Sequence, residues 1–436
     1  MTHSSDAPVQ HEIPPEQMRR VVFGGSAGMF VEFFDYGIYG FLATTLAVVF
    51  FPPEAPTAGL IMTWGIFALT FFVRPLGGMI IGAFADKAGR RAALVLSLTM
   101  MTVATGAIGL LPGYASIGYA APILLLVLRL IQGFSAGGEV ASAYSFVAES
   151  APANRRGFLT SLPQFGSYSA MLLGTSLGVA LATLLPEGSL VEWAWRVPFL
   201  VAVPLGLIGF WIRRTLQDTL AFLKAQQAGE TTESPIASTF TDKKTIVKML
   251  HAMALALLNS SGYYILFNYM PSYLNRELHF SVGQGLAVTA LAVIAMLILI
   301  PVMGYVSDKV GRRKVLMGSA IGCAVLAVPG YWLMAQGSFG LAVLGAVMLA
   351  AAFAGHAGVI NVALVELFPT KVRGTAYSVG YNLSTAIFGG AGPLVMTSLI
   401  AATAVTAIPA YYVILTAIGT FFAAAFMTEG AGKPVD

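Results

Sequence analysis

Twelve long apolar runs constrain this chain more than any other feature of its sequence. A helix needs roughly 20 apolar residues to cross the hydrocarbon core of a bilayer, and each run is about that length or longer. Only 10% of the residues are charged, whereas a soluble globular chain carries about 25%, so most of the surface must face lipid. The sequence therefore predicts an all-α membrane protein with twelve transmembrane helices, at 21–49, 58–84, 92–111, 121–147, 158–185, 197–213, 247–274, 284–306, 314–334, 339–363, 374–401 and 408–428.

One long polar segment divides these runs into two sets of six. It is rich in Gln, Thr, Glu, Ser and Lys, and no other break between runs has this length and polarity. The predicted organisation is an N-terminal tail (1–20), a six-helix bundle (21–213), a linker (214–246), a second six-helix bundle (247–428) and a C-terminal tail (429–436).

Positive charges indicate the orientation in the membrane, because cytoplasmic loops carry an excess of Lys and Arg. If the N-terminus is cytoplasmic, all but four of the 24 Lys and Arg residues fall in cytoplasmic segments. The four exceptions are Arg74, Arg129, Arg196 and Arg276. We therefore expect both termini and the linker in the cytoplasm.

Two motifs recur at nearly the same spacing. The decapeptide at 82–91, GAFADKAGRR, returns at 304–313 as GYVSDKVGRR, an offset of 222 residues. A weaker pair, ESAPANRRG at 149–157 and ELFPTKVRG at 366–374, has an offset of 217 residues. Two separate landmarks with almost one offset predict a duplicated six-helix unit, as in transporters built from parallel repeats.

The repeated decapeptide resembles the loop signature of the major facilitator superfamily, G-x-x-x-D-[RK]-x-G-R-[RK]. The run Arg129-Leu-Ile-Gln-Gly133 resembles the R-x-x-Q-G element of the same superfamily. This resemblance implies the major-facilitator fold, with two pseudo-symmetric six-helix bundles.

A narrower resemblance covers the whole chain. The stretches 32–39, 74–77, 132–139 and 193–199 are similar to the metabolite:proton symporter family, whose members take up α-ketoglutarate, citrate, shikimate, proline and glycine betaine. The stretch 263–274 is most similar to the proline/betaine branch. The resemblance implies transport of a small metabolite together with a proton.

Ionisable residues within the apolar runs are costly in a membrane, so each is a functional candidate. They are Glu32, Asp35, Arg74, Arg129, Glu139 and His356. We expect His356 to be an ordinary buried histidine rather than a proton relay.

Acidic residues on the first helix are the main candidates for proton coupling. Glu32, Asp35, Tyr36 and Tyr39 recur at i, i+3, i+4 and i+7, which places them on one helix face. A buried carboxylate holds its proton more tightly than one in water, and a neighbouring guanidinium reverses this effect. Asp35, Glu32 and Glu139 are therefore predicted proton-coupling residues. The alternative is a set of fixed ion pairs that only orient helices.

Matching depth along the helices predicts which charged residues could pair: Asp35 with Arg129, and Glu32 with Arg74. Either arginine could also bind a substrate carboxylate, since the guanidinium fork matches it with two hydrogen bonds. Polar and aromatic side chains would complete the cavity wall, with ordinary packing between helices as the alternative. The predicted substrate-binding residues are Arg129, Arg74, Tyr36, Tyr39, Gln132, Gln164, Tyr168, Tyr263, Tyr264, Asn268, Tyr381 and Asn382.

The repeated loops are predicted to form a cytoplasmic gate. The family resemblance implies that Asp86 meets the start of the eleventh helix and Asp308 that of the fifth, where a carboxylate is favourable. It also implies two ion pairs, Arg90 with Glu149 and Arg312 with Glu366. A plain positive-inside signal would explain the arginines but not the aspartates.

These features predict a proton-coupled symporter for a small carboxylate-bearing metabolite, working by alternating access in a bacterial inner membrane. A passive facilitator or antiporter of the same fold, and a non-transporting solute sensor, are the alternatives. No enzyme activity, cofactor, metal site or nucleic-acid partner is expected, and the chain is expected to be a monomer. Two intramembrane arginines suit a di- or tricarboxylate, and the acidic residues and aromatics suit a zwitterion such as proline or betaine, so the substrate stays open.

Overall fold

The computed structural model describes residues 14–88, 90–137, 139–215 and 242–433. These residues form helices joined by short turns, and they contain no strand. In the first half of the chain the helices are α1 (Pro15–Phe41), α2 (Ala43–Phe50), α3 (Pro56–Ala88), α4 (Arg90–Leu110), α5 (Tyr114–Ile117), α6 (Ala120–Ser135), α7 (Glu139–Ser150), α8 (Arg156–Leu184), the π-helical η1 (Leu190–Ala194) and α9 (Arg196–Thr215).

The second half repeats this plan with more interruptions. Its helices are α12 (Lys243–Leu255), α13 (Leu257–Tyr263), the π-helical η2 (Tyr264–Asn268), α14 (Met270–Arg276), α15 (Val282–Val310), α16 (Arg312–Met334), α17 (Phe339–Leu367), α18 (Thr370–Ser384), the π-helical η3 (Thr385–Gly390), α19 (Gly392–Thr403) and α20 (Ile408–Ala425).

The twelve predicted runs correspond to these helices. Among the described residues, ten helical stretches are long and apolar enough to cross a membrane, and the bent pair α1 and α2 makes an eleventh. The shorter apolar stretch Val95–Leu110 of α4 lies where the third run was predicted. The prediction of an all-α membrane protein with twelve spans is therefore confirmed.

Four of the predicted helices are interrupted, which the apolar runs did not reveal. The first bends by 64° between α1 and α2, and the fourth divides into α6 and α7. The seventh and eleventh each contain a π-helical turn, η2 and η3. A π-turn inserts an extra residue into the helix and is frequent at functional sites.

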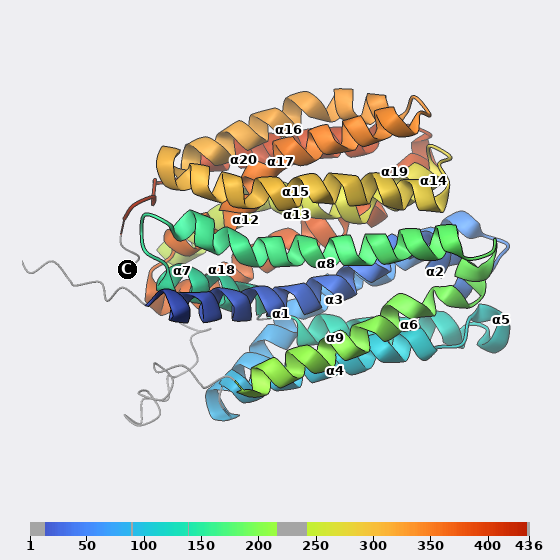
Figure 1. Ribbon diagram of the computed structural model, residues 1–436, viewed down its shortest axis with the longest axis horizontal. Helices are drawn as coiled ribbons and strands as arrows, with labels where there is room; N and C mark the ends of the chain where they lie inside the picture. The colour runs from blue at the N-terminus through green and yellow to red at the C-terminus, as the bar shows by residue number, and fades with distance from the viewer. Residues whose placement is uncertain (1–13, 89, 138, 216–241, 434–436) are drawn as a thin grey trace, which may run out of the picture.

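The two halves meet along α8 and α15, which lie side by side through the middle of the molecule (Figure 1). Within the halves, α1 packs on α8, and α16 packs on α17 and α20. Figure 1 places the start of α1 and the C-terminal segment at one end, and α2, α5 and α14 at the other. We call the first end, which carries Asp308 and the first turn of α8, the loop face, and the opposite end the outer face.

Candidate functional site

A buried arginine lies between aromatic rings where the two halves meet. The guanidinium carbon of Arg74, on α3, is 4.5 Å from the ring centre of Tyr36 on α1 and 4.2 Å from that of Phe71. The Phe71 ring in turn contacts Tyr264 of η2, with centroids 5.1 Å apart. Nε and Nη2 of Arg74 are buried and have no hydrogen-bond partner among the described residues. A buried guanidinium in this condition is suited to receive an anion.

More aromatic side chains of both halves surround this arginine. Tyr263 contacts Phe33 at 5.2 Å and Tyr168 at 5.6 Å between ring centroids. Tyr381 of α18 is buried, and its hydroxyl accepts a hydrogen bond from Nδ2 of Asn259 (3.3 Å). The predicted residues Tyr36, Tyr168, Tyr263, Tyr264 and Tyr381 are thus assembled around one centre.

The two π-turns form the second-half side of this centre. A Cβ atom built on Gly389 would lie 2.6 Å from Cδ2 of the Tyr264 ring, and one on Gly390 would lie 2.6 Å from Cγ of Phe71. Real Cβ atoms essentially never make such short contacts, so the two glycines leave the space that the rings occupy. Hydropathy alone does not reveal this packing role. The sequence signal for it is a pair of glycines inside a membrane span.

Asp35 and Arg129 form the predicted ion pair within the first half. Oδ2 of Asp35 is 3.6 Å from Nη1 of Arg129, and both side chains are buried. Oδ1 of Asp35 accepts hydrogen bonds from Nε2 of Gln132 (2.7 Å) and from the Thr105 hydroxyl. Gln132 also accepts a bond from Nη1 of Arg129 (2.7 Å). Thr105 was not predicted, because a single Thr in an apolar run carries no distinctive signal.

Arg129 is therefore held by partners of its own half. Its guanidinium carbon also lies 4.3 Å from the ring centre of Tyr39, whose hydroxyl donates to the Thr63 carbonyl (2.9 Å). Three residues predicted to bind substrate, Arg129, Gln132 and Tyr39, thus belong to the cluster around Asp35.

The predicted pairing of Glu32 with Arg74 stays a prediction, and the two groups interact electrostatically. Arg74 also contacts the rings of Tyr36 and Phe71. Glu32 is completely buried and lies within electrostatic reach of Arg74, Tyr264 and Tyr381. Matching depth thus brought the two residues to the same region, as predicted. Glu139 is the buried first residue of α7, at the break in the fourth span.

Three predicted cavity amides lie on contacts between the halves. Nδ2 of Asn382 donates to the Gly137 carbonyl (3.2 Å), and Nδ2 of Asn268 donates to the Tyr36 carbonyl (3.4 Å). Oε1 of Gln164 accepts from Nδ2 of Asn361 (3.1 Å). These amides therefore join the two halves in this conformation.

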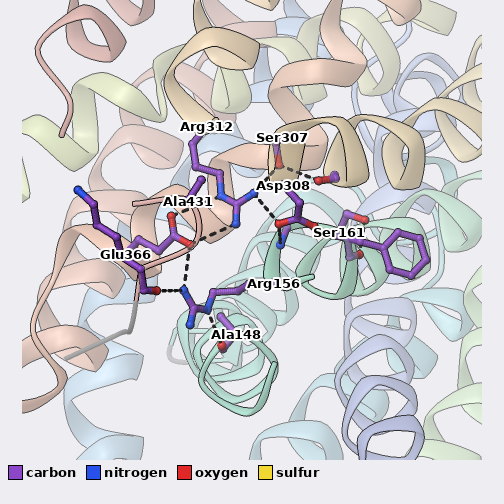
Figure 2. A network of polar contacts seen from close by, with 12 residues as sticks. Ala148, Arg156, Ser161, Ser307, Asp308, Arg312, Glu366 and Ala431 are labelled. Atoms are coloured by element: carbon purple, nitrogen blue, oxygen red, sulfur yellow. Dashed lines mark hydrogen bonds and ion pairs between the residues drawn. The ribbon is translucent and has the colours of Figure 1, made fainter. Parts of the chain in front are cut away.

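The loop face carries a network of charged residues that also joins the halves (Figure 2). Asp308, in the last turn of α15, accepts hydrogen bonds from the backbone N–H groups of Gly157 (2.8 Å) and Phe158 (2.9 Å). Arg312 pairs with Asp308 at 2.8 Å and with Glu366 at 3.3 Å. The predictions that Asp308 meets the start of the fifth span and that Arg312 pairs with Glu366 agree with these contacts.

The two gate glutamates also form ion pairs that were not predicted. Glu366 also pairs with Arg156 across the halves (3.3 Å), and Glu149 pairs with Arg373 (2.5 Å). Each glutamate thus pairs with the arginine of the opposite half. The side chains of Asp86 and Arg90 lie outside the described residues, so their predicted contacts are not described.

The C-terminal segment joins this network, although it was predicted only as a tail. Glu429 accepts hydrogen bonds from the backbone N–H groups of Arg312 (2.9 Å) and Arg313 (3.1 Å), at the start of α16. Partial burial opposes ionisation of Glu429, but backbone hydrogen bonds from Ala431, Arg312 and Arg313 outweigh it and hold its pKa below the usual value. The Lys433 carbonyl accepts a bond from Nη1 of Arg156 (2.9 Å). The segment therefore contacts both halves.

Comparison with known families covers almost the whole chain. The Sugar (and other) transporter family matches residues 21–249, and the Major Facilitator Superfamily matches residues 252–435. The chain belongs to the major facilitator superfamily. It is accordingly a multi-pass membrane transporter and not an enzyme.

Curated relatives of this superfamily include several metabolite transporters. The chain is 36% identical to the proline/betaine transporter of Salmonella typhimurium, over 96% of this chain and 85% of that one. It is 33% identical to the citrate-proton symporter of Klebsiella pneumoniae, over 98% and 96%. It is 32% identical to the alpha-ketoglutarate permease of Escherichia coli, over 87% and 86%. The resemblance to the metabolite:proton symporter family is confirmed.

Solved structures show the same major-facilitator fold. The proton:xylose symporter XylE bound to 6-bromo-6-deoxy-D-glucose superposes with a TM-score of 0.78 at 18% identity, over 96% of this chain and 98% of that one. A partially occluded inward-open conformation of XylE from E. coli superposes with a TM-score of 0.77. At this identity the likeness concerns the fold alone.

Proposed function

We propose that this major-facilitator chain is a proton-coupled symporter for a small zwitterion with one carboxylate and an alkylated ammonium group, of the proline or glycine betaine kind. The observation that carries the proposal is Arg74, a buried guanidinium with two unpartnered nitrogens among the rings of Tyr36, Phe71 and Tyr264. The relative from S. typhimurium is named a proline/betaine transporter.

The number of available cations favours one carboxylate over two or three. Nε and Nη2 of Arg129 also lack hydrogen-bond partners among the described residues, but Asp35 supplies the counter-charge of Arg129 and Gln132 accepts a hydrogen bond from it. Arg74 is therefore the arginine that we propose binds substrate. A di- or tricarboxylate would leave at least one carboxylate buried without a counter-charge, which is costly. A single bidentate Arg–carboxylate contact satisfies one carboxylate completely.

The surroundings of Arg74 suit the positive end of a zwitterion. Aromatic faces attract an alkylated ammonium group, an interaction worth about 2 kcal/mol when water is excluded. Tyr36, Tyr264 and Tyr263 supply such faces, and the buried carboxyl group of Glu32 adds negative charge in the same region. A zwitterion would therefore lie with its carboxylate on Arg74 and its ammonium group among the rings.

Asp35 is the proposed proton carrier. As a carboxylate it attracts Arg129 and accepts hydrogen bonds from Gln132 and Thr105. Protonation removes the charge that holds Arg129, so the cluster has two arrangements that differ by one proton. The transporter would then alternate between a state in which the loop-face network is closed and a state in which the loop face is open, and this alternation would move substrate and proton together. We further propose an inner-membrane location with the loop face in the cytoplasm, and a monomeric chain.

Binding to the purified transporter tests the substrate class. Titration calorimetry should give measurable affinity for glycine betaine or L-proline and none for citrate or α-ketoglutarate. Arg74→Lys keeps the charge but loses the fork geometry, and should weaken binding about 10- to 100-fold, since a charge-assisted hydrogen bond contributes about 1.5–3 kcal/mol. Arg20→Lys, on the exposed start of α1, is the matched control. Tighter binding of citrate, with Arg129→Lys more harmful than Arg74→Lys, would contradict the proposal.

A further inference from the structure

Near the outer face, an amide side chain of one half rests directly on a glycine of the other. Asn268, the last residue of η2, packs against Gly40 in the last turn of α1, and both residues are buried. A Cβ atom built on Gly40 would lie 2.5 Å from Nδ2 of Asn268 and closer still to its Cγ and Oδ1. This contact therefore exists only because residue 40 has no side chain.

The amide is held in this position from the first half. Its Nδ2 donates to the backbone carbonyl of Tyr36 (3.4 Å), one turn before Gly40 on α1. Its Oδ1 is buried and has no hydrogen-bond partner among the described residues. An asparagine side chain has only two torsions, so it has little freedom to move aside if residue 40 became larger.

Two further contacts between the halves lie beside this one. The ring of Trp64 on α3 contacts Tyr269, the residue after Asn268, with centroids 5.8 Å apart. Nearer the surface, Nη2 of Arg276 donates to the hydroxyl of Thr57 (3.1 Å). Asn268 and its neighbours therefore form a continuous contact from the membrane interior to the outer face.

We propose that Asn268 resting on Gly40 is the lock that closes the outer face, and that Asn268 is a positioning residue of this lock rather than part of the substrate-binding wall. Alternating access requires the lock to separate whenever the loop-face network is closed and substrate enters. In the present conformation the lock and the loop-face network are both closed, so the centre around Arg74 is closed at both ends. Tyr36 links the lock to that centre, because its carbonyl accepts from Asn268 and its ring lies against Arg74.

Cysteine cross-linking tests the contact directly. Because the Cβ of residue 40 falls within 2.5 Å of the Asn268 amide, the two Cβ atoms are no more than about 4 Å apart, which suits a disulfide. Gly40→Cys with Asn268→Cys, in a Cys323→Ala background because Cys323 is the single native cysteine, should cross-link rapidly with copper phenanthroline. Gly24→Cys with Asn268→Cys is the control pair. Absence of a cross-linked peptide by mass spectrometry would overturn the proposal.

Transport supplies the second test, with radiolabelled glycine betaine as the probe in proteoliposomes. The cross-link should abolish uptake and dithiothreitol should restore it. Gly40→Ala should reduce uptake at least tenfold while glycine betaine affinity changes less than threefold, because the added methyl group clashes with the Asn268 amide. Gly24→Ala, whose Cβ would meet nothing within 4 Å, should behave like wild type.

The outcomes distinguish the lock from the proposed substrate. Normal uptake by the cross-linked pair or by Gly40→Ala would overturn the lock. If wild type takes up no glycine betaine, the proposed substrate class is wrong, and the yield of cross-linked peptide still decides whether the lock exists.

Discussion

Removing the charge of Asp308 should open the loop face. This carboxylate accepts two backbone hydrogen bonds from the start of α8, at 2.8 and 2.9 Å, and one from Arg312 at 2.8 Å, and its side chain is 1% exposed. The two backbone bonds connect the halves, and they must break when the halves separate at the loop face. Asp308→Asn keeps one acceptor oxygen but loses the second and the charge.

The size of the effect follows from these bonds. A hydrogen bond to a charged group contributes about 1.5–3 kcal/mol, and a carboxylate at a helix N-terminus gains up to about 2 kcal/mol more in partly buried geometry. Allowing for the oxygen that Asn retains, the closed state should lose about 3 kcal/mol relative to the open one. That corresponds to a shift of about a hundredfold in the equilibrium between the two.

Cysteine accessibility measures this shift in the purified transporter. Ser161 lies in the loop-face contact, where a Cβ on Gly304 would be 2.7 Å from its Oγ, and it is buried. In a Ser161→Cys, Cys323→Ala background, Asp308→Asn should raise the rate of maleimide labelling at least tenfold.

A matched control separates opening of the loop face from loss of a helix cap. Asp242 also accepts two backbone N–H groups at a helix start, at 3.1 and 3.2 Å, but they belong to its own helix, α12. Asp242→Asn should leave the labelling rate unchanged. An unchanged rate in Asp308→Asn, or an equal rise in both variants, would refute the reasoning.

Two further substitutions test other parts of the site. Gly390→Ala should weaken glycine betaine binding about tenfold in calorimetry by displacing Phe71, because overpacking a tight contact costs about 1–3 kcal/mol, whereas Gly374→Ala, whose Cβ would meet nothing within 4 Å, should bind normally. Glu429→Gln should lower the free energy of unfolding by about 1 kcal/mol after allowing for its partial exposure, as read from thermal denaturation. Because the pKa of Glu429 is lowered, its contribution is complete above the ordinary glutamate pKa and is lost only as the pH falls through the lowered value. The difference should therefore be constant between about pH 6 and pH 8, and a difference that grows across this range would contradict the role of its charge.

Hydropathy and repeated motifs predicted the fold because they report length and depth. Twelve apolar runs indicated the spans, and the two offsets indicated the duplication. Depth also predicted the pair Asp35 and Arg129, which come from two helices of one half. The family resemblance supplied the partners of Asp308 and Arg312.

Contacts that depend on helix rotation and on interruptions were not predictable in this way. Arg74 lies against the rings of Tyr36 and Phe71 because of its side-chain direction, which depth in the membrane does not report. Asn268 lies on the contact between the halves because η2 shifts the helix register. Glu429 looked like an ordinary tail residue because its backbone partners are distant in sequence.

Accumulation of substrate against its gradient tests proton-coupled symport most directly. Proteoliposomes containing the purified transporter, with an acidic exterior and radiolabelled glycine betaine, should concentrate the label inside above the external level while an internal dye reports acidification. Asp35→Asn should bind glycine betaine but bring it only to equal concentrations on both sides. Wild-type uptake that ignores the proton gradient, or accumulation by Asp35→Asn equal to that of wild type, would contradict the proposed mechanism.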